Sequence, residues 1–251
     1  MFETRSQHLR LLQPEAVAGA GGPPSETRRL RSGLAVADAL AVRWSFAPGA
    51  VLRWLLAANV GLGAAGVSLG LMLRDDPALY FREMMPGTWL SGAQILAAAV
   101  IARAIHRREH GGGRRWHESL WGLSAVMLVA FAVVELTQPT VFLGKWLQSH
   151  ADVRAPLGIS DVDAVLLIAL LAGAGAVLAT RAGALLRHPR ALPLFACAGA
   201  LGAASQAIDA TFAVSAWEFV VEDGLKALAE PFLIAGYLVV LGRVIASSRP
   251  G

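Results

Sequence analysis

The sequence predicts an all-α membrane protein, a polytopic bundle of six transmembrane helices with the N-terminus and the C-terminus in the cytoplasm. Of its 251 residues, 55% are hydrophobic and only 16% are charged, whereas soluble domains carry about 25% charged residues. The mean hydropathy is +0.54. Several apolar runs approach the roughly 20 residues that a helix needs to cross a bilayer. These observations together favour a membrane bundle over a soluble fold.

The first 47 residues are predicted to form a cytoplasmic tail. No apolar core begins within the first thirty residues, so we expect no cleavable signal peptide. The stretch Glu26–Phe46 has apolar residues on one side of a helical pattern and is predicted to form an amphipathic helix on the membrane surface. The formal net charge is +4, but large surfaces that combine basic and aromatic residues are missing. Nucleic acid is therefore excluded as an expected partner.

Residues 48–246 are predicted to form the transmembrane domain. Its six spans are expected at about 51–73, 87–105, 118–138, 162–186, 192–214 and 217–246, and residues 247–251 form a second cytoplasmic tail. The positive charges set the direction of the spans. Seven arginines lie up to residue 53, five at 103–115, three at 181–190 and two after residue 242, which makes 17 of the 22 lysines and arginines. Because cytoplasmic connections are enriched in Lys and Arg, both termini are predicted to be cytoplasmic.

Small and polar residues within the spans predict how the helices pack. Gly66 and Gly70 form a small-xxx-small pair that allows close approach of another helix. Gly173 and Gly175 likewise predict tight packing of the fourth span. Asn59 is the one strongly polar residue of the first span, and we expect it to form a hydrogen bond to another helix.

Two prolines mark changes in helix geometry. Pro139 follows the third span and is predicted to end it. Pro231 lies inside the sixth span, where a proline frees a backbone carbonyl and commonly kinks the helix.

The sixth span carries an unusual stripe of ionisable residues. Glu218, Glu222, Lys226 and Glu230 recur at every fourth position, and Asp223 lies one position from that line. Residues four apart are neighbours on a helix, so these groups share one broad face. Each ionisable group at membrane depth costs about 2.5–3.5 kcal/mol on insertion scales, so the stripe must face protein or water.

The predicted topology brings further polar residues to the same depth. The third and fifth spans run outward and the sixth runs inward, so their polar residues all lie toward the outer surface. The predicted binding residues are Glu135, Gln138, Gln206, Asp209, Glu222, Asp223, Lys226 and Glu230. Five acids against one lysine leave a formal surplus of four negative charges, which requires protonation, a bound cation or water.

Metal and cofactor sites are not predicted. His106 and His110 have the i,i+4 spacing of a metal pair, but neighbouring arginines would repel a cation, and a solvated loop explains them better. All six histidines fall in tails or loops, which also weighs against haem. Cys197 is the single cysteine and is predicted to be a packing residue.

Three classes of function remain open. In the first, an outward-facing, carboxylate-rich site binds a proton, a cation or a small cationic ligand, in transport or in a receptor-like role. In the second, paired carboxylates act as general acid and base in an intramembrane enzyme; the lack of histidines within the spans weighs against it, and no catalytic residue is assigned. In the third, the chain is a structural subunit or assembly factor, with a membrane-protein partner or a further copy of itself besides the bilayer.

From the second to the sixth span the chain resembles bacterial multi-pass integral membrane proteins of unassigned activity. Those proteins carry an acidic pair followed by His-Glu after the third span, and an EExxE-like run that opens the last span. The segment VEDGLKALAE is similar to the second feature, whereas only Glu135 corresponds to the first and no His-Glu follows it. The resemblance implies a location in the bacterial cytoplasmic membrane and implies no activity.

Overall fold

The structure is a computed structural model that describes residues 26–81, 86–110, 115–139, 142–143, 146–147, 162–211 and 215–248. The described elements are helices, and there is no strand among them. The chain divides into two units, Met1–Ala35 and Val36–Gly251. The described part of the first unit is the start of α1 (Glu26–Trp44), which covers the stretch where a surface helix was predicted. The candidate site lies entirely in the second unit.

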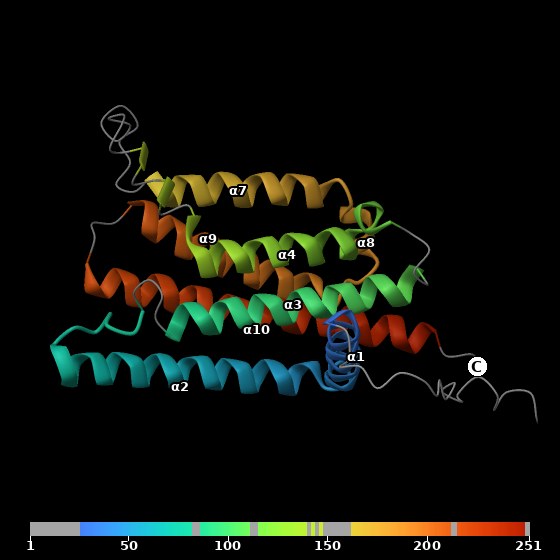
Figure 1. The fold of residues 1–251 in the computed structure, drawn as a ribbon, viewed down its shortest axis with the longest axis horizontal. Coiled ribbons are helices and arrows are strands. Elements are labelled where there is room, and N and C mark those ends of the chain that lie inside the picture. The colour runs from blue at the N-terminus through green and yellow to red at the C-terminus, as the bar shows by residue number, and fades with distance from the viewer. Residues whose placement is uncertain are drawn as a thin grey trace, which may run out of the picture. The chain divides into compact units, whose positions relative to one another are not determined.

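The second unit consists mainly of long apolar helices. They are α2 (Pro48–Arg74), α3 (Pro86–His110), α4 (Leu120–Thr137), α7 (Val162–Ala179), α8 (Ala182–Leu186), α9 (Leu192–Thr211) and α10 (Ala216–Ser247), with a 3-10 turn at Trp116–Glu118 (Figure 1). Within the described residues, five of them (α2, α3, α4, α9 and α10) are long and apolar enough to cross a membrane. The all-α fold predicted from the sequence is thus confirmed for the described residues, and the five helices suggest a multi-pass membrane protein.

The predicted fourth span differs from the other five. The stretch 162–186 is not one helix: α7 ends at Ala179, a turn at Thr180 and Arg181 follows, and α8 is a separate short helix. The helix α7 has 18 residues, and it is not among the five candidate spans found in the described residues. A Cβ added at Gly173 or Gly175 would meet no atom of the described residues within 4 Å, so no tight packing at these glycines is found among them.

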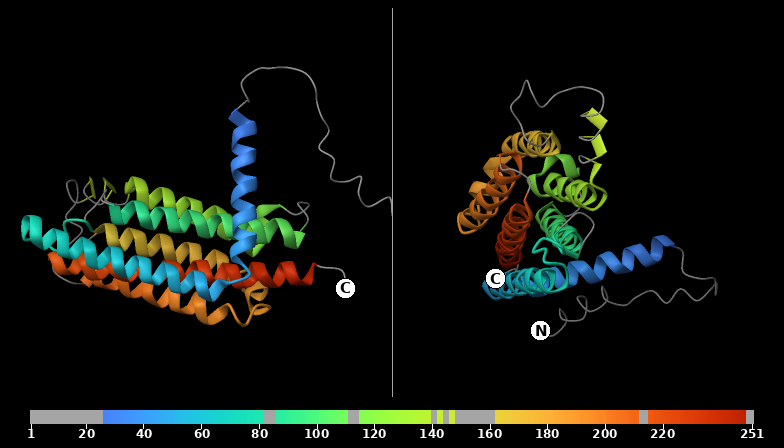
Figure 2. Two further views of the ribbon diagram at one scale, coloured as in Figure 1. Left: turned by 90° about the horizontal axis from the view of Figure 1, so that it is seen from below. Right: turned by 90° about the vertical axis from the view of Figure 1, so that its left-hand side faces the viewer.

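Helix α10 is the centre of the bundle. It packs against α2, α3 and α9, while α4 packs against α3, and α7 contacts both α4 and α9. The end-on view of Figure 2 shows α10 enclosed by these neighbours. Among these helices, α2 and α3 pack directly on α10, and α4 packs on α3.

One end of the bundle is held by an aromatic core. The ring of Tyr237 on α10 packs edge-on against Phe195 of α9, at 5.0 Å between centroids, and against Trp121 of α4, at 6.1 Å. A Cβ at Gly236 would lie 2.9 Å from the Phe195 ring, so the absence of a side chain there is what admits that ring. These contacts join α4, α9 and α10.

Large apolar side chains cover the outside of the helices. On α2, Trp54 is 77% exposed and Met72 is 81% exposed, and Asn59 and Gly70 are its only buried residues. Exposed apolar area of this extent is unusual for a soluble monomer but is expected for a surface in contact with lipid. The burial pattern thus agrees with the hydropathy.

The glycine pair of α2 accommodates a loop rather than a helix. A Cβ at Gly70 would lie 2.3 Å from the carbonyl oxygen of Asp76, in the connection that follows α2, and a Cβ at Gly66 would lie 3.4 Å from the ring of Phe81. The chain turns back here because Asp75 adopts a left-handed backbone conformation with φ 55°. The predicted close approach at Gly66 and Gly70 exists, but the segment that approaches them is the connection after α2 and not another helix.

This close approach predicts different effects for two glycines of the same helix. Replacing Gly70 with alanine should lower the melting temperature of the purified protein in detergent, since overpacking against a backbone costs about 1–3 kcal/mol. The matched change Gly61→Ala, where nothing lies within 4 Å, should leave it unchanged or raise it, because alanine favours the helix. Equal melting temperatures for the two variants would contradict the close approach at Gly70.

Candidate functional site

The ionisable stripe of α10 forms a buried ion-pair cluster. The Lys226 Nζ lies 2.5 Å from Glu222 Oε1 and 3.5 Å from Asp223 Oδ1. Glu222 is buried, whereas Asp223 and Lys226 are half-buried. The i,i+3 and i,i+4 spacing on one helix places the three groups together without help from other elements.

Glu218, at the start of the stripe, has a local structural role. Ser215 caps α10 by accepting a hydrogen bond from the Glu218 backbone N–H, and the Glu218 carboxylate accepts one from the Ser215 backbone N–H. This capping box satisfies backbone donors at the helix start. Glu218 is therefore a helix-capping residue rather than a member of the cluster.

Glu230 extends the cluster one turn beyond Lys226. The hydroxyl of Ser91 on α3 donates a hydrogen bond to Glu230 Oε1. Glu230 is only 7% exposed, and its second oxygen, Oε2, is buried without a hydrogen-bond partner among the described residues. A buried carboxylate oxygen without a partner is costly. That oxygen is the clearest unsatisfied group of the site.

Glu135 joins the cluster from α4. It lies close enough to Lys226, Asp223 and Glu230 to interact electrostatically with each of them. Four carboxyl groups (Glu135, Glu222, Asp223 and Glu230) thus surround one amine. The lysine balances only one of them, which leaves a formal surplus of three negative charges.

A second polar group fixes the backbone beside the cluster. Pro231 has no N–H, so the Ala227 carbonyl four residues earlier has no donor from its own helix. The Asn59 side chain of α2 donates a hydrogen bond to this carbonyl. Asn59 is itself paired with Gln94 of α3, with Nδ2 to Oε1 at 3.2 Å and Gln94 Nε2 to Asn59 Oδ1 at 2.9 Å. The interhelical hydrogen bond expected of Asn59 is confirmed, and it joins three helices.

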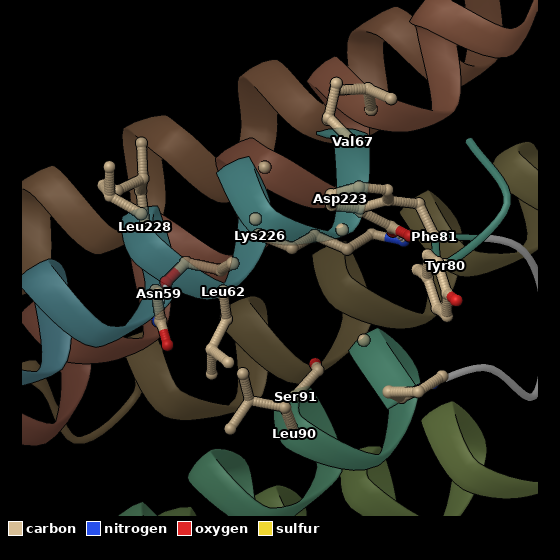
Figure 3. A pocket seen from close by; sticks show the side chains of 18 of the residues that line it. Asn59, Leu62, Val67, Tyr80, Phe81, Leu90, Ser91, Asp223, Lys226 and Leu228 are labelled. Carbon is tan, nitrogen blue, oxygen red and sulfur yellow. Dashed lines mark hydrogen bonds and ion pairs between the residues drawn. The ribbon is translucent and has the colours of Figure 1, made fainter. Parts of the chain in front are cut away.

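These groups lie along a cavity of about 690 Å³ between α2, α3 and α10. The side of α2 from Val60 to Leu69 and the aromatic rings of Tyr80 and Phe81 form most of its wall, and Glu135, Asp223, Lys226 and Glu230 supply its charges. Figure 3 shows Lys226 extended toward Asp223 at one side of this space. The cavity therefore combines apolar walls with one acidic corner.

Four predicted site residues do not line this cavity. Glu222 is one of them, although it pairs with Lys226, which does. Gln138 caps the end of α4 in a left-handed conformation with φ 49°, so it leaves the helical face that carries Glu135. Gln206 is buried on α9, and its Oε1 has no hydrogen-bond partner in the described part of the chain. Asp209 is half-buried on the same helix. The cavity is lined from α2, α3, α4, α10 and the connection after α2, without α9.

Sequence reasoning did not assign Asn59, Ser91, Tyr80 or Phe81 to the site. Tyr80 and Phe81 belong to the connection between α2 and α3, and the sequence pattern of a connection does not predict where its side chains lie. Asn59 had a detectable signal: a lone asparagine in one span and a proline in another are complementary, because the proline frees a carbonyl. Ser91 had none, since a single serine in an apolar helix is common.

The histidine pair at the other end has protein partners of its own. His106 Nδ1 lies 2.6 Å from Ser119 Oγ, and its ring packs edge-on against His110 at 5.4 Å. Within the described ranges no group of three or more His, Cys, Asp or Glu side chains is arranged to hold a metal ion.

Comparison of the chain with protein-family models, with curated proteins and with solved structures finds no match. The resemblance to bacterial multi-pass membrane proteins therefore stays a prediction, and the function must be argued from the site alone.

The Asn59–Ala227 hydrogen bond predicts a coupling between two substitutions. Asn59→Leu should lower stability by about 1–3 kcal/mol because it strands Gln94 and the Ala227 carbonyl. In a Pro231→Ala background the loss should be smaller, since residue 231 then has an N–H that can donate to Ala227. Thermal denaturation of the parent, Asn59→Leu, Pro231→Ala and the double variant measures the coupling energy between the two substitutions. Ser68→Ala, which removes an exposed local hydrogen bond of α2, is the control and should have little effect. An equal loss in both backgrounds would contradict the role given to Pro231.

Proposed function

We propose that this protein binds a small organic cation in the cavity between α2, α3 and α10. The observation that carries the proposal is the unpaired Oε2 of Glu230, buried beside a surplus of negative charge. A cationic group of a ligand in the cavity would pair with this carboxylate oxygen and neutralise part of the surplus negative charge. A volume of about 690 Å³ lies within the range of small-molecule sites, roughly 300–1,000 Å³.

The apolar walls support an organic cation with an apolar body over a bare ion. Most lining residues are aliphatic, and Tyr80 and Phe81 add aromatic rings. Aromatic faces attract ammonium groups when the groups lie within about 6 Å. Ca²⁺ and Mg²⁺ need several oxygen ligands around one point, and in the described ranges no three His, Cys, Asp or Glu side chains are arranged to hold a metal ion.

The same proposal includes a topology. The chain would cross a bacterial cytoplasmic membrane six times with both termini inside, and α7 with α8 would form the fourth crossing. The arginine distribution supports it, because 17 of 22 basic residues fall on the side assigned to the cytoplasm. In that orientation the cavity lies toward the outer side, since its lining comes from the second half of α2, the first half of α10 and the start of α3. A cavity lined from one half of the bundle supports a receptor-like or substrate-capturing role.

The site predicts a charge-dependent affinity. Benzyltrimethylammonium should bind the purified protein in calorimetric titrations, and neopentylbenzene, its neutral isostere, should bind far more weakly. Glu230→Gln and Glu135→Gln should each weaken binding about tenfold or more, because a charge pair at 4 Å and an effective dielectric of 20 contributes about 4 kcal/mol. Glu109→Gln, which removes an acid at the opposite end of α3, should bind like the parent. Equal binding of cation and isostere, or unchanged binding by Glu230→Gln, would refute the proposal.

The topology predicts which positions a membrane-impermeant maleimide reaches in intact cells. In a Cys197→Ser background, a cysteine at Pro139, at the end of α4, should react from outside. A cysteine at His117, which is exposed before α4 begins, should react only after the membrane is permeabilised. The reverse pattern would invert the orientation, and reaction of both in intact cells would refute the crossing by α4.

A further inference from the structure

A second cavity lies at the opposite, arginine-rich end of the bundle. Its volume is about 710 Å³, and its walls come from the turn between α1 and α2, the connection between α8 and α9, and the last turns of α10. Gly242 brings two of these elements together, since a Cβ there would lie 2.8 Å from the carbonyl oxygen of Ser45. This cavity shares no residue with the acidic one.

The charges around this cavity are positive. Arg190 and Arg243 line it, and no carboxyl group is among its described lining residues. Neither arginine has an ion-pair partner among the described residues. Two arginines that line one recess with no carboxyl group among its described lining residues favour the binding of an anion there.

His188 adds a buried polar group to the same wall. Its residue is 7% exposed, its ring packs edge-on against Trp121 at 5.7 Å, and its Nδ1 has no hydrogen-bond partner within the part of the chain described. Burial lowers the pKa of His188 from its ordinary value of 6.5, and the nearby Arg243 guanidinium lowers it further, although Glu109 acts in the opposite direction. The ring is therefore neutral at pH 7 and carries one N–H donor.

The remaining walls are apolar. Phe46, Pro48, Val239 and Ile245 line the cavity beside the charged groups. The recess thus combines two arginines and a histidine with apolar residues suited to contact hydrocarbon.

We propose that this cavity binds a phosphate group, held by Arg190 and Arg243, with His188 beside them. Planar guanidinium groups bind phosphate oxygens with paired hydrogen bonds, which makes arginine the preferred residue for this recognition. Basic recesses between transmembrane helices on the cytoplasmic side are a common type of site for anionic lipid headgroups. The ligand is a phosphodiester of an anionic lipid or a free phosphate, and both share this chemistry. The inference does not depend on the cation site.

Two measurements test the site and separate the sources. Native mass spectrometry of the delipidated, full-length protein counts bound lipid after addition of phosphatidylglycerol or phosphatidylcholine. Calorimetric titration with inorganic phosphate tests the free anion.

If the ligand is a lipid headgroup, the parent should retain phosphatidylglycerol in preference to phosphatidylcholine. If the ligand is a free phosphate, the parent should bind inorganic phosphate. Arg190→Gln combined with Arg243→Gln should weaken binding about tenfold or more, since a hydrogen bond to a charged group contributes about 1.5–3 kcal/mol.

Arg108→Gln is the matched control, because Arg108 is exposed at the same end and does not line the cavity. It should bind phosphatidylglycerol and phosphate like the parent. Both substituted arginines are exposed, so the double variant should keep the parent melting temperature, and replacing them with lysine should restore part of the binding. Unchanged binding by the double variant, an equal loss in Arg108→Gln, or no binding of either probe by the parent would overturn the proposal.

Discussion

The missing N–H of Pro231 is the constraint on which the arrangement of the bundle depends. Inside a membrane a free carbonyl finds no water, so another part of the protein must supply a donor. Asn59 does so, and Gln94 holds Asn59 in the required orientation by two reciprocal hydrogen bonds. Each of the three groups comes from a different helix. A defect in the backbone of α10 therefore determines where α2 and α3 lie, and these two helices form most of the walls of the acidic cavity.

The same segment of α10 carries the charges, and their balance is the physical basis of the proposed cation binding. Lys226 is already engaged by Glu222 at 2.5 Å and by Asp223 at 3.5 Å. Neither Glu230 nor Glu135 forms an ion pair with it that is as close as these two. A buried ion pair of this kind offsets its own desolvation at best. The two remaining acids stay uncompensated by protein, and the cavity is the place where compensation can enter.

Local geometry explains which parts of the site could be predicted from the sequence. The stripe on α10 follows from helical spacing alone, and Glu135 could be placed by counting spans and their direction. Depth does not determine rotation about the helix axis, however, and so Gln206 and Asp209 were assigned to a cavity that α9 does not line. Gln138 was misplaced for a different reason, because the residue before Pro139 leaves the helix. The interruption of 162–186 at Thr180 and Arg181 is a local turn, in which the Thr180 hydroxyl donates a hydrogen bond to the Val177 carbonyl and the Arg181 backbone N–H donates one to the Leu178 carbonyl. Hydropathy does not record such a turn.

The two cavities lie along one helix, α10, and are lined by charged residues of opposite sign. The packing of the segment between them bears on whether a ligand could pass from one cavity to the other. Along α10 the acidic cavity ends at Glu230 and the basic one begins at Val239. The intervening turns hold Pro231, Ile234, Tyr237 and Leu238, all of them buried. Their side chains pack against Trp121 and Phe195 rather than around a space. A cation that reaches Glu230 therefore meets closely packed aromatic and aliphatic groups beyond it, whose displacement would cost several contacts at once. If the proposed cation binds, that barrier favours its capture from one side over free passage through the bundle.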